Sequence, residues 1–230
     1  MNTNNKTQID KAMQAFPLWN QLGTEQRAER LTNSLNTLTG DARKMAQWQI
    51  NNALAQIAAK QLMPGPTGES NLLSNQGRGV FVSLITDLPA QREQLFTAVV
   101  GQVYAALVAG NSVIHHGEMG QTLLANLEAY LPEGVLQDSN QTEHQANLLD
   151  IRLAGVCALT DDKNLIEIKQ TLANKEGLLC QLVSETDFIN YSSQSKPSFI
   201  HQFTTEQTIS TNTTAVGGNA TLLELGSKTD

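Results

Sequence analysis

Two histidines and a carboxylate stand close together in the sequence, where they could bind a metal or exchange protons. His115 and His116 end the apolar run NSVIHH, and Glu118 follows after one glycine. Successive side chains of a strand point to opposite faces, so His116 and Glu118 can share a face, whereas His115 and His116 cannot easily bind one metal. A zinc site needs three or four ligands. The remaining histidines, His144 and His201, lie far along the chain, and we therefore expect no metal site.

Other chemistry-bearing motifs are equally sparse. Cys157 and Cys180 stand in the apolar stretches AGVCALT and GLLCQLV, which favours buried free thiols over a disulfide or a metal site. The sequence contains no G-x-G-x-x-G after a strand, no G-x-x-x-x-G-K-[ST] and no G-x-S-x-G, the motifs typical of dinucleotide sites, phosphate loops and serine hydrolases. By themselves these residues predict an α/β domain and no particular reaction.

The elements that would position these residues alternate between helix and strand. Apolar spacing predicts helices over residues 7–39, with a bend or helix start at Pro17, and 41–60, and the proline- and glycine-rich LMPGPTGESN predicts a loop. Apolar strands are then expected over residues 79–85, 111–116, 153–160 and 178–183, alternating with helices over 93–110, 120–131 and 164–177. Such alternation predicts a Rossmann-like parallel sheet with helices on both faces.

The C-terminal segment has a different texture. Threonine-rich runs flank Gly217, Gly218 and Asn219 in QTISTNTTAVGGNATLLELG, which predicts a β-hairpin. A lone hairpin is marginally stable, so it must pack on this domain or on another chain. We expect a homodimer through this hairpin, with Asn212 and the Gly-Gly-Asn turn as oligomerisation residues. The predicted organisation is residues 1–64 helical, 65–203 a Rossmann-like cofactor-type domain, and 204–230 an oligomerisation flap.

Composition limits the partners. The chain has 230 residues and a formal net charge of −7, which disfavours nucleic acid and anionic membranes as partners. No apolar run approaches the roughly 20 residues that cross a bilayer. The opening MNTNNKTQIDK lacks the apolar segment of a signal peptide, so we expect a cytoplasmic protein.

Several segments together resemble the aldehyde dehydrogenase superfamily, in particular its 1-pyrroline-5-carboxylate dehydrogenase branch. AMQAFPLWNQLGTEQRAERL is similar to the first helices of these enzymes, and PGPTGESN followed by GRGVFVSL resembles the lead-in to their cofactor domain. GQVYAALVAGNSVI, LAGVCALTDD and LVSETD resemble later landmarks in the same order. The resemblance covers residues from about 9 to 187 and implies the fold of that cofactor domain.

The pairing of PGPTGESN with a terminal TISTNTTAVGGNATLLELG is more specific. It resembles the C-terminal domain of long forms of bifunctional proline utilization A. That likeness implies a domain without the catalytic half, which helps to cover a substrate passage and carries an oligomerisation-type hairpin. It also implies a proline-catabolic enzyme as a possible partner.

The chain departs from the pattern of active family members at the cofactor site. Where their strand ends in lysine-proline, with the lysine on the cofactor ribose, this sequence has His116 and Gly117. The glycine-serine that contacts the cofactor phosphates corresponds to Asp161 and Asp162, whose carboxylates would repel a pyrophosphate. The turn that should supply an oxyanion-stabilising asparagine reads TDLPAQREQ, without asparagine.

The catalytic residues depart as well. Glu185 aligns with the family's catalytic glutamate, but Asp187 and Phe188 replace two following glycines. The nucleophilic cysteine of active enzymes lies downstream of that glutamate, and no cysteine follows Glu185. Without a thiolate no thiohemiacetal forms and no hydride is available to transfer. We therefore expect no cofactor.

Three functional hypotheses follow. The first is a catalytically inactive domain with a structural or assembly role in proline catabolism. The second is a divergent NAD-dependent 1-pyrroline-5-carboxylate dehydrogenase that oxidises glutamate semialdehyde to glutamate. The third is a nucleotide- or metabolite-binding regulator that keeps part of the crevice at the strand ends, with His116, Glu118 and Thr160 as a remnant of the cofactor site.

Overall fold

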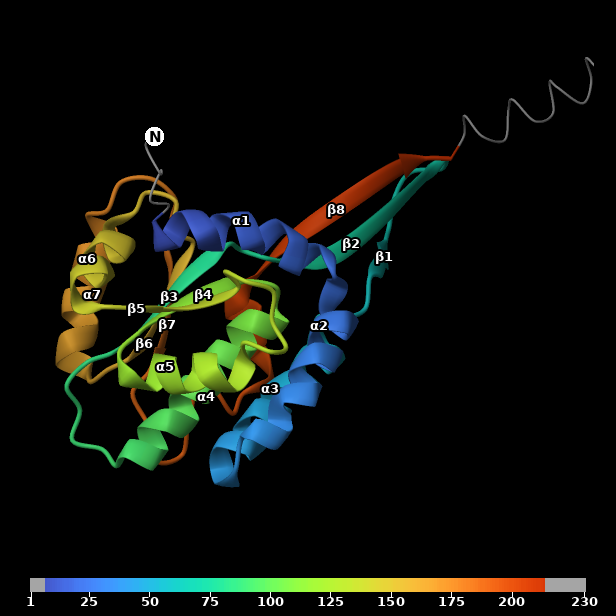
Figure 1. Cartoon of the computed structure of the whole chain (residues 1–230). Coiled ribbons are helices and arrows are strands. Elements are labelled where there is room, and N and C mark those ends of the chain that lie inside the picture. The colour runs from blue at the N-terminus through green and yellow to red at the C-terminus, as the bar shows by residue number, and fades with distance from the viewer. Residues whose placement is uncertain (1–6, 214–230) are drawn as a thin grey trace, which may run out of the picture.

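The computed structural model describes residues 7–213, apart from the side chains of residues 141, 142, 144 and 145. Its centre is a five-stranded parallel sheet with the strand order β5-β4-β3-β6-β7 (Figure 1). The strands are β3 (Val80–Ile85), β4 (Ser112–His116), β5 (Leu136–Ser139), β6 (Gly155–Leu159) and β7 (Gln181–Glu185). The predicted Rossmann-like α/β fold is thereby confirmed.

The sheet is buried on both faces because its central strands are apolar on both sides. In β3 the side chains of Val80, Val82 and Leu84 join one apolar cluster, and Phe81 joins the other. The first cluster includes Ile9 and Ala12 of α1 (Gln8–Gln21), and Ile168 and Leu172 of α7 (Asp162–Ala173) pack against it. The second holds most of α4 (Arg92–Val108) and part of α5 (Glu118–Leu127). Figure 1 shows α1 on one side of the sheet and α4 and α5 on the other.

The remaining helices complete the body of the molecule. They are α2 (Gly23–Asn33), the 3₁₀ helix η1 (Ser34–Thr37), α3 (Gly40–Gln56), α6 (Gln141–Leu149) and the 3₁₀ helix η2 (Pro197–Phe203). Buried polar groups fix the N-terminal helices to α4: the Trp19 indole donates to the Leu107 carbonyl at 2.8 Å, and Arg27 Nε donates to the Val108 carbonyl at 2.9 Å. Burial lowers the pKa of Arg27 to about 10, and the guanidinium stays charged at the carboxyl end of α4, where the helix dipole favours a cation.

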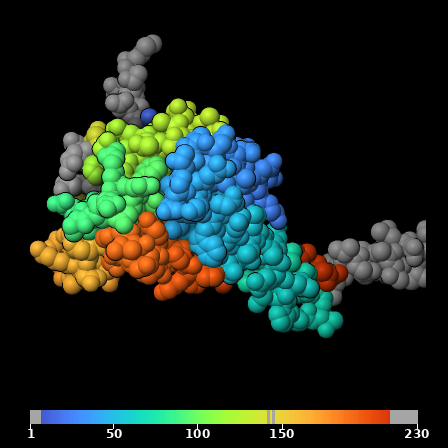
Figure 2. Space-filling model, turned by 90° about the horizontal axis from the view of Figure 1, so that it is seen from below, coloured from blue at the N-terminus to red at the C-terminus, as the bar shows by residue number. Residues whose placement is uncertain are grey.

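A second sheet extends from the body as an arm. It consists of β1 (Gln61–Met63), β2 (Glu69–Gly77) and β8 (Thr204–Asn212), paired antiparallel in the order β1-β2-β8. Figure 1 shows β2 and β8 leaving the body together, and Figure 2 shows the arm protruding from the side of the molecule. The first strand of the predicted C-terminal hairpin therefore pairs with β2 of its own chain, whereas the turn at Gly217, Gly218 and Asn219 lies outside the described residues.

Several predicted boundaries were wrong. Residues 7–39 form two α-helices and a 3₁₀ turn, because the chain turns at Gly23, which has φ of +81°, and Pro17 lies inside α1. The predicted proline-rich loop is confirmed over residues 64–68, whereas its two ends belong to β1 and β2. The polar stretch that begins at residue 137 contains most of β5 and α6, and the last sheet strand starts at Gln181 rather than at 178. Edge and arm strands are partly solvated, so they lack the apolar pattern that reveals the central strands.

Among the described residues, no helix is both long enough and apolar enough to cross a bilayer.

An ion-pair cluster ties α1 to the loop that precedes β6. Arg152 donates to Asp10 and to Asp150 at 2.8 Å each. The hydrogen bond from Arg152 is the largest cause that lowers the pKa of Asp10 to about 2. A carboxyl group whose pKa is lower in the folded chain stabilises the fold above its unfolded pKa, and this contribution disappears as the pH falls through the folded pKa.

We therefore expect the substitution Arg152→Gln to lower the free energy of unfolding near neutral pH, with an effect that declines as the pH falls towards about 2 and disappears below it, where Asp10 becomes protonated in the wild type as well. Urea unfolding across this acid range measures the difference. Lys44→Gln is the matched control, because Lys44 pairs with Asp41 at an exposed site and such pairs contribute little. A difference between wild type and Arg152→Gln that stays as large below pH 2 as at neutral pH would contradict the assignment.

Candidate functional site

The place where a Rossmann-like sheet binds ligands is the point at which the strand order reverses. Here it lies between the carboxyl ends of β3 and β6, because consecutive connections run from β3 to β4 and β5 on one side and to β6 and β7 on the other. Thr86 follows β3 and Thr160 follows β6, and the Thr86 hydroxyl donates to the Thr160 hydroxyl at 3.2 Å. Thr160 is fully buried. The carboxyl ends of β3 and β6 are therefore joined by a direct contact between these two threonines.

The helix that follows β6 has its amino terminus occupied by its own side chain. Asp161 is the N-cap of α7 and accepts from the Asn164 backbone N–H at 2.8 Å and from the Asn164 amide at 3.2 Å. Asp162 adds a second carboxylate in the first turn. A helix amino terminus binds phosphate through free N–H groups and its positive dipole end. Asp161 uses one of those N–H groups, and both carboxylates repel a phosphate.

The turn between β3 and α4 does not compensate for this loss. Residues 86–91 contain no glycine, so the backbone cannot approach a pyrophosphate as it does in a glycine-rich turn. Gln91 and Gln94 cap α4 reciprocally, and the Gln91 N–H donates to the Gln94 side chain at 3.3 Å. Both helix termini at the crevice are therefore capped by side chains. These residues do not fit a dinucleotide cofactor.

The two histidines lie in different surroundings. His115 is fully buried, and its Nδ1 lies 2.9 Å from the Ser83 hydroxyl. Gly120 packs directly against the His115 ring, and a Cβ there would lie 3.0 Å from the ring atom Cγ. His116 is half-buried, with Nδ1 3.2 Å from the Ser139 carbonyl oxygen. Within the described part of the chain, no group of three potential ligands is placed to hold a metal.

Glu118 is held by an arginine that the sequence did not single out. Arg92 donates to both carboxylate oxygens of Glu118 at 2.8 Å. These bonds lower the pKa of Glu118 and raise the pKa of Arg92. Both side chains are well exposed, so the pair contributes little to stability. It joins the first turns of α4 and α5 and keeps Glu118 ionised.

Glu185 is the most constrained carboxylate of the site. It ends β7 and is 1% exposed. One oxygen accepts from the backbone N–H groups of Thr186 and Asp187, both at 3.1 Å. The other accepts from the backbone N–H groups of Ser193 and Gln194, at 2.9 and 3.1 Å. Because two carboxylate oxygens offer about four acceptor positions in total, this carboxylate is fully used in holding the loop that follows β7.

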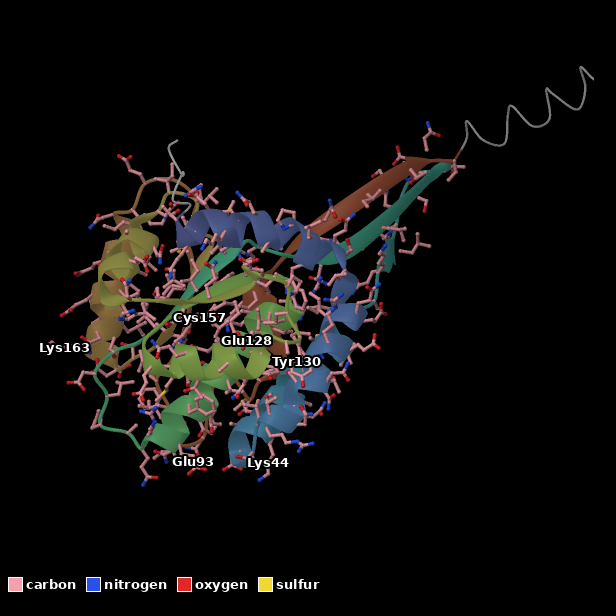
Figure 3. All side chains as sticks on the ribbon, viewed as in Figure 1. Lys44, Glu93, Glu128, Tyr130, Cys157 and Lys163 are labelled. Carbon is pink, nitrogen blue, oxygen red and sulfur yellow. The ribbon has the colours of Figure 1, made fainter. Side chains whose placement is uncertain are left out.

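Neither cysteine provides a nucleophile at this site. Cys157 lies within β6 and is fully buried (labelled in Figure 3), and burial strongly raises the pKa of its thiol. Cys180 was predicted on a strand, but it precedes β7, where it is partly exposed, and desolvation is the main cause that raises its pKa. A thiol attacks as the thiolate, so a raised pKa makes both groups unreactive at neutral pH.

Several residues that shape the site carried no recognisable signal in the sequence. Arg92 and Asn164 are ordinary polar helix residues until the fold brings them to Glu118 and Asp161. Tyr191 has a positive φ of 53°, and tyrosine gives no indication of that conformation, which glycine or asparagine would have suggested. The capping role of Asp161 was the detectable one, since an aspartate just before an amphipathic run is typical of an N-cap.

Comparisons with known proteins agree with this architecture. No protein-family model and no curated protein matches the chain. Among solved structures, a variant of proline utilization A from Bradyrhizobium japonicum matches with a TM-score of 0.68 and 24% identity, over 78% of this chain and 21% of that chain. A structure of bifunctional proline utilization A protein matches with a TM-score of 0.67 and 25% identity over the same shares. An NADP dependent enzyme from E. coli matches with a TM-score of 0.63 and 14% identity, over 77% of this chain and 42% of that chain.

The chain has an aldehyde dehydrogenase-like fold. This is the fold that the sequence resemblance predicted, and the matched region lies within proline utilization A. The chain spans 21% of the length of those structures. The likeness therefore concerns one region of a much longer protein.

Proposed function

We propose that the chain is a catalytically inactive domain of the aldehyde dehydrogenase type, related to 1-pyrroline-5-carboxylate dehydrogenases, with a structural and assembly role in proline catabolism. The likeness of the fold to that of proline utilization A supports a role in proline catabolism. The observation that carries the proposal is the environment of Glu185, whose carboxylate accepts four backbone hydrogen bonds. A glutamate in this position acts on its own loop and has no acceptor left for a water or a substrate proton.

The rest of the site supports the same proposal. Aldehyde oxidation through a covalent intermediate needs an activated nucleophile and a bound hydride acceptor. Cys157 is fully buried with a raised pKa, and the amino terminus of α7, where a cofactor phosphate would bind, is capped by Asp161. Loss of the nucleophile, the base and the phosphate site together favours a scaffold over a weak enzyme.

An activity measurement tests this proposal. We expect the purified protein to form no NADH from 1-pyrroline-5-carboxylate and NAD above the background of buffer, and to release no heat when NAD is titrated into it. NADH formation that Cys157→Ser abolishes would instead establish the alternative, an NAD-dependent 1-pyrroline-5-carboxylate dehydrogenase. A rise in melting temperature with NAD, NADP or adenosine nucleotides but without turnover would favour a nucleotide-binding regulator with His116, Glu118 and Thr160 at its site.

The arm supports the assembly role. Leu62, Leu72 and Ile209 are direct neighbours across the three strands, and they are 72%, 39% and 52% exposed. A three-stranded sheet with an apolar row facing water is stabilised by a partner surface. We propose that two chains pair through this arm, with Asn212 and the residues Gly217, Gly218 and Asn219, which lie outside the described part of the chain, as oligomerisation residues. A proline-catabolic enzyme is the other partner that the fold likeness suggests.

A charge introduced into the apolar row of the arm tests this pairing. We expect Ile209→Lys to convert a dimer into a monomer in light scattering, because two copies of the arm would bring like charges into an apolar contact. Thr208→Lys is the matched control: it is the neighbouring residue, is also exposed, and points to the opposite face of the strand. A wild-type protein that is monomeric at high concentration, or an Ile209→Lys variant that remains dimeric, would contradict pairing through this face.

A further inference from the structure

A hollow with two aromatic walls lies away from the strand ends. It has a volume of about 380 Å³ and lies between α3, the first turns of α4 and the segment that follows β7. Trp48 and Tyr191 line it, together with Met45, Thr97 and Asp41. In Figure 2 these three parts of the chain, coloured blue, green and orange, meet on the face shown. This surface takes no part in the site at the strand ends.

Both aromatic walls are held by the loop that Glu185 anchors. The Trp48 indole N–H donates to the Gln194 carbonyl at 3.1 Å. Tyr191 adopts a left-handed backbone with φ of 53°, and its N–H donates to the Asp187 carbonyl at 3.0 Å. Non-glycine residues in this conformation persist only where the surroundings impose it. The hollow is therefore preorganised, so a ligand need not order its walls.

The charge around the hollow is acidic. Asp41 lines it, and Glu93 lies beside it, since a Cβ at Gly40 would be 3.7 Å from a Glu93 carboxylate oxygen. Burial is the main cause that raises the pKa of Tyr191, and the charges of Asp41 and Glu93 raise it further. Lys44 also lines the hollow and pairs with Asp41 at 2.8 Å, with both side chains well exposed. Figure 3 shows Lys44 and Glu93 at the same end of the molecule.

We propose that this hollow binds a small organic cation of the quaternary ammonium class between Trp48 and Tyr191. A cation near an aromatic face is attracted by the negative face of the ring, most strongly for tryptophan. Asp41 and Glu93 together exceed the single positive charge of Lys44, so the surroundings favour a positive ligand over an anion. A hard metal ion would lack the six or more oxygen ligands that it prefers, whereas an alkylated ammonium needs only apolar and aromatic contact.

The ion pair between Lys44 and Asp41 allows the effect of charge on binding to be tested in both directions. Lys44 competes with a bound cation for Asp41, so its removal should tighten binding, whereas removal of the Asp41 charge should weaken it. Exposed charge pairs of this kind are weak, so we expect each variant to change the Kd by about 1.5- to fivefold. Opposite effects of two neighbouring exposed residues distinguish charge recognition from loss of structure.

Tryptophan fluorescence provides the measurement. The sequence has two tryptophans; Trp19 is fully buried and Trp48 is 40% exposed, so a ligand in the hollow changes the emission of Trp48. We expect choline and tetramethylammonium to give a saturable change, and the neutral 3,3-dimethyl-1-butanol, which has the shape of choline, to bind more weakly. Sodium chloride at matched ionic strength is the control for general salt effects.

Three variants complete the test. We expect Lys44→Met to tighten choline binding, Asp41→Asn to weaken it, and Trp48→Leu, followed by calorimetry, to weaken it roughly 2- to 30-fold. Melting temperatures identify any variant that fails to fold; Asp41 and Lys44 are well exposed, so their pair keeps the test open if Trp48→Leu unfolds. Equal binding of choline and its neutral analogue, no saturable response, or weaker binding by Lys44→Met would each overturn the proposal.

Discussion

Glu185→Gln is expected to lower the free energy of unfolding by about 3–5 kcal/mol. The carboxylate accepts two backbone N–H groups on each oxygen, and the amide that replaces it must turn an NH₂ group towards one of these pairs of donors. Two N–H groups, at least one of them only partly buried, then lose their acceptor, and hydrogen bonds to a charged group are worth about 1.5–3 kcal/mol each. Removal of one partner from a buried charged interaction typically costs about 3–5 kcal/mol.

Urea unfolding of the purified variant measures this loss, and hydrogen exchange of the Ser193 and Gln194 amides shows whether it arises in the loop. Asp187→Asn is the matched control. Asp187 accepts from the Ile189 and Asn190 backbone N–H groups at 3.1 and 2.9 Å, but it does so at an exposed position, and we expect a much smaller loss of stability than for Glu185→Gln. A Glu185→Gln variant as stable as wild type would contradict the structural role, since a carboxylate kept for catalysis can be replaced without such a loss.

The second large effect is expected at Gly155, where β6 begins. Gly155 pairs with Phe81 across the parallel strands β3 and β6, and the Phe81 ring lies over the glycine. A Cβ at position 155 would lie 2.5 and 2.6 Å from the ring atoms Cζ and Cδ1. The ring cannot move away, because it is fully buried and its centroid lies 5.3 Å from that of Phe203. We expect Gly155→Ala to cost about 3 kcal/mol, at the upper end of the range for overpacked cores.

A double-mutant cycle distinguishes this clash from a general effect on the strand. Phe81→Leu removes part of the ring and is itself destabilising because it leaves a cavity. If the clash is the cause, Gly155→Ala should cost much less in the Phe81→Leu background than in the wild type, which denaturant unfolding of the four proteins measures. Additive effects of the two substitutions would show that the alanine destabilises for another reason.

The layered α/β architecture was predictable from the sequence because its central strands are continuous apolar runs. VFVSLI and GVCAL have no polar face, so they must lie between two layers of helices. β5, with the sequence LQDS, has partly exposed residues and α6 is polar along much of its length. The arm strands are partly or fully exposed along most of their length, so they lack an apolar pattern, and their antiparallel register with each other identifies them.

The role of Glu185 could not be predicted from the sequence. The resemblance predicts that Glu185 stands at the position of a catalytic glutamate, but its hydrogen bonds are made with four backbone N–H groups, two of which come from residues eight and nine positions further along. The conformation of that intervening loop, including the left-handed Tyr191, has no local signal. Likewise, Arg92 reaches Glu118 only because the first turns of α4 and α5 lie close together.

The sequence by itself determined the fold class, the burial of Cys157 and the absence of a glycine-rich phosphate turn, since each depends on residue type and local pattern. The tertiary structure decided which groups meet: the two threonines at the ends of β3 and β6, the donors around Glu185, and the residues that line the aromatic hollow between α3 and α4. The physical reason is that hydrogen bonds and cavities form between segments distant in the chain, and nothing in the local sequence encodes the partner across that distance.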